Sequence, residues 1–220
     1  MRVILVRHGQ VQQGPKATFY GGADVPLSSL GQLEAQKAGV FLKEIRFDHI
    51  VCSPLSRARY GANQVAERQE PVFEPLESVD GFREIDRGRW FGLTQEEVLR
   101  EWPGDWEAHQ ANLENWREHG GESIGDLRDR VLESLEILRS RWFGRTICIV
   151  SHLFPTRAML AFGAGQDLTE WERFKIPTAS ISALEFTSRG SCEVALVGKV
   201  PQKDEVASES SLFPSFGKTT

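Results

Sequence analysis

The sequence predicts an α/β fold: a three-layer sandwich in which a mostly parallel central sheet carries helices on both faces and a helical lid insertion. The apolar runs at residues 3–6 and 146–150 are continuous rather than alternating, as in strands buried on both faces of a parallel sheet. Segments with helical periodicity separate such runs, so strands and helices alternate along the chain.

The first half of the chain predicts three strands and two helices. We expect strands at residues 3–6, 49–52 and 72–76, and helices from Ser28 or Ser29 to about Ile45 and from Pro54 to about Glu67. Either serine can cap the first helix, and Leu30 and Leu33 share helical spacing with its apolar stripe. The third strand is the weakest, because prolines interrupt it.

Residues 81–121 predict a helical insertion over the sheet edge, which we interpret as a lid. Tryptophans lie here among glycines, prolines and charges, and anchoring the insertion to the core is favoured over an aromatic patch for a flat ligand. We expect solvated side chains at Arg83, Arg87 and Arg89, although one of them could assist substrate binding.

The last part of the chain predicts one long helix, one short helix and three strands. The long helix starts at Ser123, which forms a capping box with Asp126. Strands are expected at residues 146–150, 180–186 and 193–200, and the short helix at 155–162. Residues 1–200 then form a single domain, and residues 201–220, rich in Ser, Lys and Glu, form a flexible C-terminal tail.

Composition limits the classes of function. The 220 residues are 40% hydrophobic and 26% charged, which suits one domain, and the net charge of −5 argues against nucleic-acid and membrane-surface partners. No apolar run approaches the length of a membrane span. Three cysteines in apolar surroundings suggest reduced thiols and a cytoplasmic protein. A homodimer is left open.

Three polar segments follow predicted strands. They are Arg7-His8-Gly9-Gln10, Ser53-Pro54-Leu55-Ser56-Arg57-Ala58 and Ser151-His152. In open α/β sheets the ligand crevice lies beyond the carboxyl ends of the strands, so we expect these segments to meet there. Two arginines and two histidines supply the cationic donors and the nucleophile that phosphoryl transfer requires.

Six ordered segments make the sequence resemble the histidine phosphatase superfamily, the phosphoglycerate-mutase-like proteins. The segments are 5–10, 24–28 with Gly31, 52–58, 82–90 with 92–94, 121–123 and 150–152. The resemblance implies His8 as nucleophile, Arg7, Arg57 and His152 as phosphate ligands, and Glu84 as general acid and base. It also marks Gln10, Tyr20 and Gly21 as substrate-binding candidates, and it needs no metal or cofactor.

These roles set chemical requirements. His8 must be neutral, with its second ring nitrogen donating to an acceptor such as a backbone carbonyl. His152 is expected to be protonated when it faces a phosphate dianion. The pKa of Glu84 is lowered by the arginines and raised by burial and by the bound dianion, and it must keep a proton for the leaving group.

The stretches 19–28 and 86–94 look most like the alpha-ribazole phosphatases of cobalamin biosynthesis, which makes alpha-ribazole 5′-phosphate the expected small-molecule substrate. Phosphoglycerate mutase and sugar-phosphate phosphatase activities are alternatives, and a noncatalytic phosphate-ligand binder is an alternative of another class. Gly14 stands where mutases usually have an asparagine. Leu153 and Phe154 replace the family's usual glycines after the last histidine, which makes one pocket wall more apolar.

Overall fold

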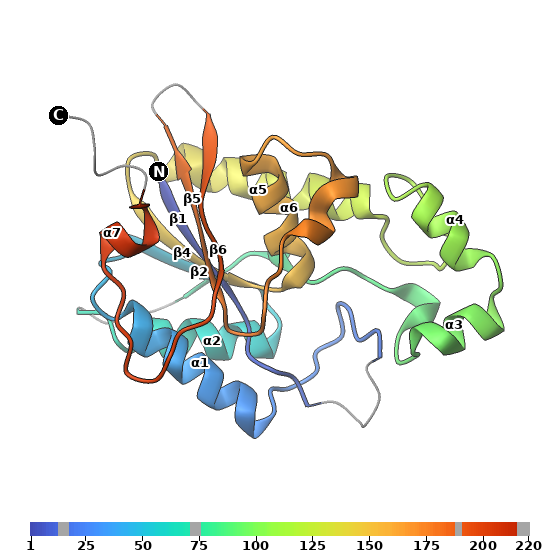
Figure 1. The fold of residues 1–220 in the computed structure, drawn as a ribbon, viewed down its shortest axis with the longest axis horizontal. Helices are drawn as coiled ribbons and strands as arrows, with labels where there is room; N and C mark the ends of the chain where they lie inside the picture. Colours follow the sequence, from blue (N-terminus) through green and yellow to red (C-terminus); the bar gives the residue numbers. More distant parts are fainter. Residues whose placement is uncertain (13–17, 71–75, 188–190, 215–220) are drawn as a thin grey trace.

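A mixed sheet forms the centre of the computed structural model, which describes residues 1–12, 18–70, 76–187 and 191–214 (Figure 1). Its described strands are β1 (Arg2–Arg7), β2 (His49–Cys52), β3 (Glu77–Ser78), β4 (Thr146–Ser151), β5 (Ile181–Phe186) and β6 (Cys192–Lys199). They lie in the order β3-β2-β4-β1-β5-β6, and among these strands β5 alone runs antiparallel to all the others. The predicted α/β fold with a mostly parallel sheet is therefore confirmed.

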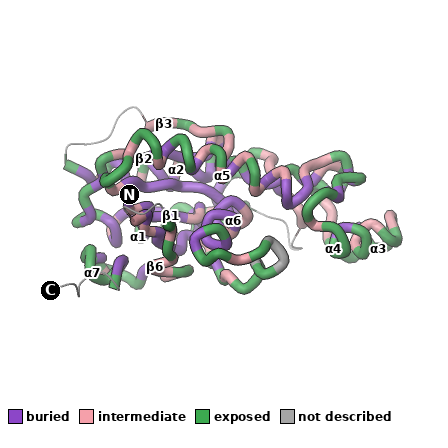
Figure 2. The backbone as a smooth tube through the Cα atoms, turned by 90° about the horizontal axis from the view of Figure 1, so that it is seen from above, coloured by how far each residue is buried: buried purple, intermediate pink, exposed green. Residues whose placement is uncertain are grey.

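Helices cover both faces of the sheet. One face carries α5 (Ile124–Arg141) and α6 (Leu153–Gly163), and the other α1 (Ser29–Leu42), α2 (Ser56–Ala66) and α7 (Glu209–Leu212). Successive β1 residues face opposite sides, so Val3 and Leu5 join the first core and Ile4 and Val6 the second. Figure 2 shows the buried strands running through the middle of the molecule.

The start of α1 lies against the turn after β1. Ser28 caps the helix by accepting a hydrogen bond from the Gly31 backbone N–H. A Cβ on Gly9 would lie 2.1 Å from the Gly31 carbonyl oxygen, so this close approach requires glycine. The buried stripe predicted for α1 was wrong in one detail, because Leu30 and Leu33 are 49% and 54% exposed.

The region predicted as a helical insertion contains α3 (Gln95–Glu101) and α4 (Asp105–Ala111). These helices stand apart from the sheet instead of lying on its edge (Figure 1). Trp90 and Trp116 are buried there in a separate aromatic core, which Phe19, Trp102 and Trp106 border. The tryptophans were expected to anchor the insertion to the core of the sheet, but Trp90 and Trp116 instead pack in a core that belongs to the insertion itself.

The C-terminal segment is packed where a flexible tail was expected. Ala207, Leu212 and Phe213 are buried in the same core as α1 and α2, and the Arg2 guanidinium lies 4.9 Å from the Phe213 ring centre. The expectation of looseness over residues 201–214 was wrong because it weighed the polar composition and not these apolar side chains. Residues 215–220, and the predicted strand at 72–76 apart from residue 76, lie outside the described residues.

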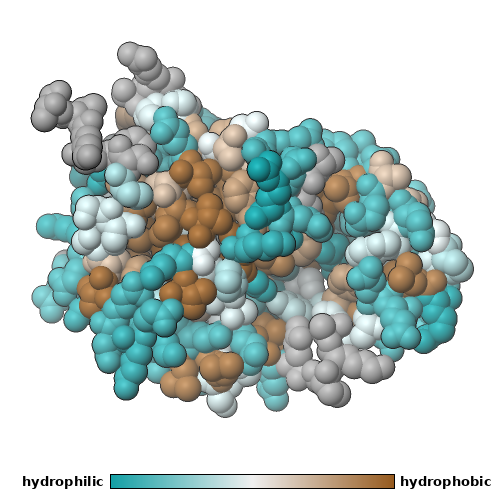
Figure 3. Space-filling view, in the orientation of Figure 1, coloured by the Kyte–Doolittle hydropathy of each residue, from teal (hydrophilic) through white to brown (hydrophobic). Residues whose placement is uncertain are grey.

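The edge strand β6 leaves apolar side chains at the surface. Val197 on this strand is 39% exposed and Val200 just after it 42%. Figure 3 shows apolar groups gathered on the face of the molecule that Figure 1 draws in front. Cys52 and Cys148 are buried free thiols, as expected. Among the described helices, none is both long and apolar enough to cross a membrane. A homodimer stays a prediction.

Candidate active site

The carboxyl ends of β1, β2 and β4 bring the three predicted segments together. β4 pairs in parallel with both other strands, with Arg7 opposite Ser151 and Cys52 opposite Val150. The His8 backbone N–H donates to the Ser151 carbonyl at 3.0 Å, which continues this alignment past the strand end. His8, Ser53 and His152 therefore follow three neighbouring strands at the same edge.

His8 is buried in a form that suits nucleophilic attack. The side chain is 1% exposed, and Nδ1 lies 2.6 Å from the Gly9 carbonyl oxygen, to which it must donate. Nε2 then carries the lone pair, and it has no hydrogen-bond partner among the described residues. Burial, followed by the charges of Arg57 and Arg7, holds the pKa of His8 well below its usual value, so the ring is neutral.

Arg57 and Arg7 place two guanidinium groups beside this histidine. Arg57 is fully buried and donates to the carbonyl oxygens of Ala23 at 2.6 Å and Gly21 at 2.9 Å. Arg7 donates to the Ile176 carbonyl oxygen at 2.5 Å, while its buried Nε has no described partner. Backbone carbonyls thus hold both arginines in position, which suits the binding of a phosphoryl group.

His152 is neutral in this structure, which differs from the protonated form expected next to phosphate. Its Nδ1 accepts a hydrogen bond from Arg57 Nε at 3.3 Å, and its Nε2 lies 2.7 Å from Ser53 Oγ. Burial, followed by His8 and Arg57, holds the pKa of His152 well below its usual value. The ring centroids of His8 and His152 lie 5.0 Å apart. A positive charge on His152, added to those of Arg57 and Arg7, therefore needs an anion beside it.

Glu84 joins these groups from the turn that follows β3 and the 3₁₀ segment Asp80–Phe82. Its carboxylate is almost fully buried, with Oε1 accepting from the Ile85 N–H at 3.0 Å and Oε2 from the Leu153 N–H at 3.2 Å. Burial raises the pKa of Glu84 against the opposing charges of Arg7, Arg57 and Arg87. Of the competing influences expected from the sequence, burial is the larger.

The substrate-binding candidates are placed differently from one another. Tyr20 and Gly21 line a cavity of about 300 Å³ together with Arg7 and Glu84, and Tyr20 lies 5.2 Å from the Arg57 guanidinium. Gln10 does not line this cavity: its side-chain oxygen accepts from Ser28 Oγ at 2.8 Å and the residue is exposed. The tight approach of Gly9 to Gly31 carries Gln10 to the start of α1 instead.

The family model of the histidine phosphatase superfamily, branch 1, matches residues 3–198. The chain belongs to this superfamily. The match covers most of the chain and confirms the resemblance that the six sequence segments carry.

The proteins to which this chain is similar are named for different phosphate esters. The chain is 32% identical to phosphoserine phosphatase 1 of Hydrogenobacter thermophilus over 86% of this chain and 88% of that protein. The crystal structure of the alpha-ribazole phosphatase from Shigella flexneri superposes with a TM-score of 0.83 at 22% identity, covering 95% of this chain and all of the other. A mycobacterial glucosyl-3-phosphoglycerate phosphatase gives a TM-score of 0.77 at 26% identity, covering 90% and 98%.

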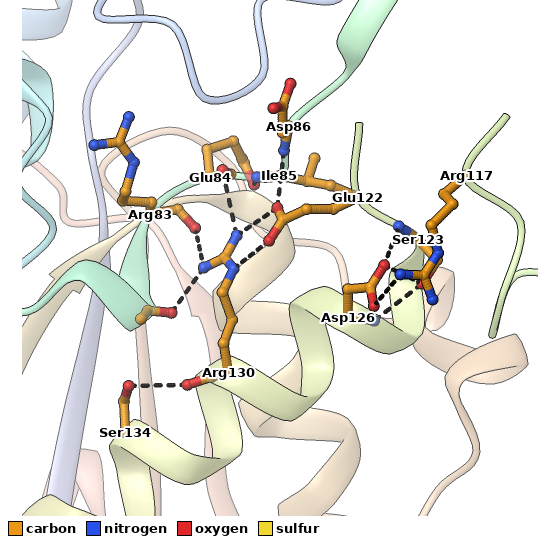
Figure 4. A network of polar contacts seen from close by, with 11 residues as sticks. Arg83, Glu84, Ile85, Asp86, Arg117, Glu122, Ser123, Asp126, Arg130 and Ser134 are labelled. Atoms are coloured by element: carbon orange, nitrogen blue, oxygen red, sulfur yellow. Dashed lines mark hydrogen bonds and ion pairs between the residues drawn. The ribbon is translucent and has the colours of Figure 1, made fainter. Parts of the chain in front are cut away.

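An ion pair between Arg130 on α5 and Glu122, just before that helix, holds the turn that carries Glu84. Arg130 and Glu122 make two contacts, Nε to Oε1 at 2.6 Å and NH2 to Oε2 at 2.8 Å (Figure 4). The Arg130 guanidinium also donates to the carbonyl oxygens of Gly81, Arg83 and Glu84 at 2.8, 2.9 and 3.4 Å. Glu122 Oε2 accepts from the Asp86 N–H at 2.9 Å, so the pair spans both sides of Glu84.

Arg87 was assigned to the solvated charges by sequence reasoning, and the structure shows this to be wrong. Its side chain lines the 300 Å³ cavity and is only 6% exposed. Arg83, by contrast, keeps a side chain that is 47% exposed, and Arg89 pairs with Asp105 at 2.5 Å. The sequence feature that could have identified Arg87 is its position three residues after Glu84, within a segment that resembles the histidine phosphatase superfamily.

Proposed function

We propose that this histidine phosphatase hydrolyses phosphomonoesters of small molecules through a phosphohistidine on His8. The observation that carries the proposal is the buried Nε2 lone pair of His8, which has no described partner and lies beside Arg7 and Arg57. Nε2 forms a bond to phosphorus while the bond from phosphorus to the ester oxygen breaks. The arginines offset the charge that develops on the peripheral phosphoryl oxygens.

Glu84 supplies the proton in this scheme. Its raised pKa favours the protonated form, from which the carboxyl group protonates the departing alkoxide. In the second step the Glu84 carboxylate takes a proton from water as the water oxygen attacks phosphohistidine. Inorganic phosphate leaves, and His8 and Glu84 regain their starting protonation states.

The substrate is a separate part of the proposal. Resemblance in the stretches 19–28 and 86–94 supports alpha-ribazole 5′-phosphate, and a cobalamin pathway role would follow from it. The similarity to phosphoserine phosphatase 1 supports phosphoserine as a second candidate. Phosphoglycerate isomerisation is the mutase alternative, and it is excluded if free phosphate accumulates from phosphomonoesters while isomerisation stays at background.

The test is a comparison of wild type with His8→Ala on p-nitrophenyl phosphate and a panel of biological phosphomonoesters that includes both candidates. We expect the variant to lose hydrolysis and to lose the acid-labile, base-stable label that wild type takes from a ³²P-labelled ester. His49→Ala is the matched control, because His49 opens β2 and pairs with Glu77 at 2.6 Å. Unchanged hydrolysis by His8→Ala would exclude the proposed nucleophile, and an inactive wild type would favour a phosphate-ligand binder.

A further inference from the structure

Arg87 is a nearly buried cation that has no hydrogen-bond acceptor among the described residues. Its guanidinium carbon lies 4.5 Å from the ring centre of Phe154 and 5.4 Å from that of Phe19, and no hydrogen bond from the guanidinium to a described residue is present. Burial lowers the pKa of Arg87 to about 10, opposed only by the charge of Glu84. The side chain therefore stays charged at neutral pH.

The other two arginines of the site have acceptors among the described residues. Arg57 donates to two backbone carbonyls and to His152, and Arg7 donates to the Ile176 carbonyl, although its buried Nε has no described partner. Aromatic rings attract a cation but accept no in-plane N–H hydrogen bond of comparable strength. The guanidinium of Arg87 borders the cavity and has no described acceptor, and an anionic ligand in that cavity would supply one.

The position of Arg87 defines which part of a substrate it would meet. Its charge lowers the pKa of Glu84 together with those of Arg7 and Arg57, whereas only Arg57 and Arg7 are among the charges that lower the pKa of His8. Arg87 and Glu84 line the same 300 Å³ cavity, which is at the small end of ligand pockets. Glu84 serves the leaving oxygen in the proposed reaction, so Arg87 lies on the leaving-group side.

We propose that Arg87 binds a carboxylate on the leaving group, which makes phosphorylated hydroxy acids the preferred substrate class. This inference rests on the proposed function. A guanidinium with free N–H groups matches the planar, two-oxygen geometry of a carboxylate. A nucleoside or sugar phosphate without a second anion, alpha-ribazole 5′-phosphate included, leaves Arg87 without that contact, so the inference favours phosphoserine of the two candidate substrates.

A wider depression on the other side of Glu84 is less suited to an anion. It has a volume of about 820 Å³, and its lining holds Arg83 and Arg130 against five acidic side chains. Those acids are Asp80, Glu84, Asp86, Glu122 and Glu133. Their charges repel a carboxylate, whereas the smaller cavity offers Arg7 and Arg87 against Glu84 alone.

Matched substrate pairs test the inference on the wild type. O-phosphoserine and O-phosphoethanolamine differ by one carboxylate, and 3-phosphoglycerate and glycerol 3-phosphate differ by a carboxylate in place of a hydroxymethyl group. We expect kcat/KM to be about 10- to 100-fold higher for the carboxylate member of each pair. Equal values within both pairs, with p-nitrophenyl phosphate hydrolysed, would overturn the inference and leave the proposed function standing.

Variants at position 87 then test whether Arg87 is the residue that produces the preference for carboxylate-bearing esters. Arg87→Gln should remove most of the preference while p-nitrophenyl phosphate is still hydrolysed, and Arg87→Lys should restore part of it. Arg83→Gln is the comparison, because Arg83 lies in the same loop with a half-exposed side chain. A loss of preference in Arg83→Gln alone, or an equal loss for every ester in Arg87→Gln with an unchanged Tm, would contradict the assignment to Arg87. If no ester is hydrolysed by wild type, the proposed function itself fails.

Discussion

Arg57 Nε donates a hydrogen bond to His152 Nδ1 at 3.3 Å, and this contact decides which ring nitrogen of His152 carries the proton. Because arginine is only a donor, Nδ1 must be the acceptor, so the proton lies on Nε2 and is donated to Ser53 Oγ. The same guanidinium that is suited to binding phosphate therefore keeps His152 neutral. An incoming dianion changes this balance, because it favours the cationic form of the ring.

Binding of a dianion should be coupled to proton uptake. Sulfate is a suitable probe because it stays a dianion near neutral pH. We expect its charge to raise the pKa of His152, which is lowered in this structure, and to raise that of Glu84 further. Titration calorimetry at pH 7 in two buffers of different ionisation enthalpy measures the protons taken up. His152→Gln should reduce the uptake, and so should Glu84→Gln. Sulfate binding without proton uptake in wild type would contradict the expected protonation of His152.

Glu84→Gln should separate esters by their leaving groups. Hydrolysis of alkyl phosphates, whose alkoxides need a proton, should slow by about 10²- to 10⁴-fold, whereas activated aryl phosphates should slow far less. The measurement is kcat/KM across a series of esters with leaving groups of graded pKa. The variant should show a steeper dependence on leaving-group pKa than wild type. Equal losses across the series would refute the acid role.

The Arg130 ion pair should act through Glu84. Arg130→Met removes the donors that hold the carbonyls of Gly81, Arg83 and Glu84. We expect kcat on alkyl phosphates to fall about 10-fold or more, with a smaller loss on aryl esters, because the acid is displaced from the leaving oxygen. Arg128→Met is the matched control, since Arg128 lies on the same helix and pairs with the half-exposed Glu114 at 2.7 Å.

A positioning role for Arg130 also predicts non-additivity. Once Glu84 is replaced by glutamine, the further change Arg130→Met should cost little additional activity on alkyl phosphates. The thermal unfolding midpoints of all variants provide the check for unfolding. Additive losses in the double variant would mean that Arg130 supports activity by a route independent of Glu84.

Local patterns explain which parts of the site could be predicted from the sequence. His8 and His152 directly follow continuous apolar strands, so their shared edge follows from the sheet topology alone. The cap at Ser28 and the capping box at Ser123 are also set by residues within three positions. Arg7, His8, Arg57 and His152 could therefore be grouped from segments that follow strands, whereas Glu84 was added by the resemblance to the histidine phosphatase superfamily.

Long-range packing explains what could not be predicted. Arg87 is buried because Phe19 and Phe154, both distant in the chain, lie against its guanidinium. Gln10 was a substrate-binding candidate because of the resemblance, but its side-chain oxygen accepts a hydrogen bond from Ser28. Neither contact follows from composition or periodicity, since each depends on how separate segments approach one another.

Stability should fall with acid because of histidines in the aromatic core of the insertion. His109 is 3% exposed, and its ring meets Trp90 edge-on with centroids 5.3 Å apart. Burial, followed by the charges of Arg87 and His119, lowers the pKa of His109 to about 4. In the unfolded chain a histidine has a pKa of about 6.5. Between these values the unfolded state binds more protons, so the free energy of unfolding falls as pH decreases from about 6.5 to about 4.

His109→Phe should weaken this dependence. Urea unfolding at pH values from 4.5 to 8 gives the free energy of unfolding at each pH, and the variant's slope below pH 6.5 should be smaller by up to about 1.4 kcal/mol per pH unit, the value for one proton. Above about pH 6.5 the curves of unfolding free energy against pH should run parallel for wild type and variant. Any constant offset between them comes from replacing the imidazole ring by a phenyl ring. Identical slopes below pH 6.5 would show that His109 takes up its proton in the folded protein as readily as in the unfolded chain. Its burial against Trp90 would then not hold the ring neutral.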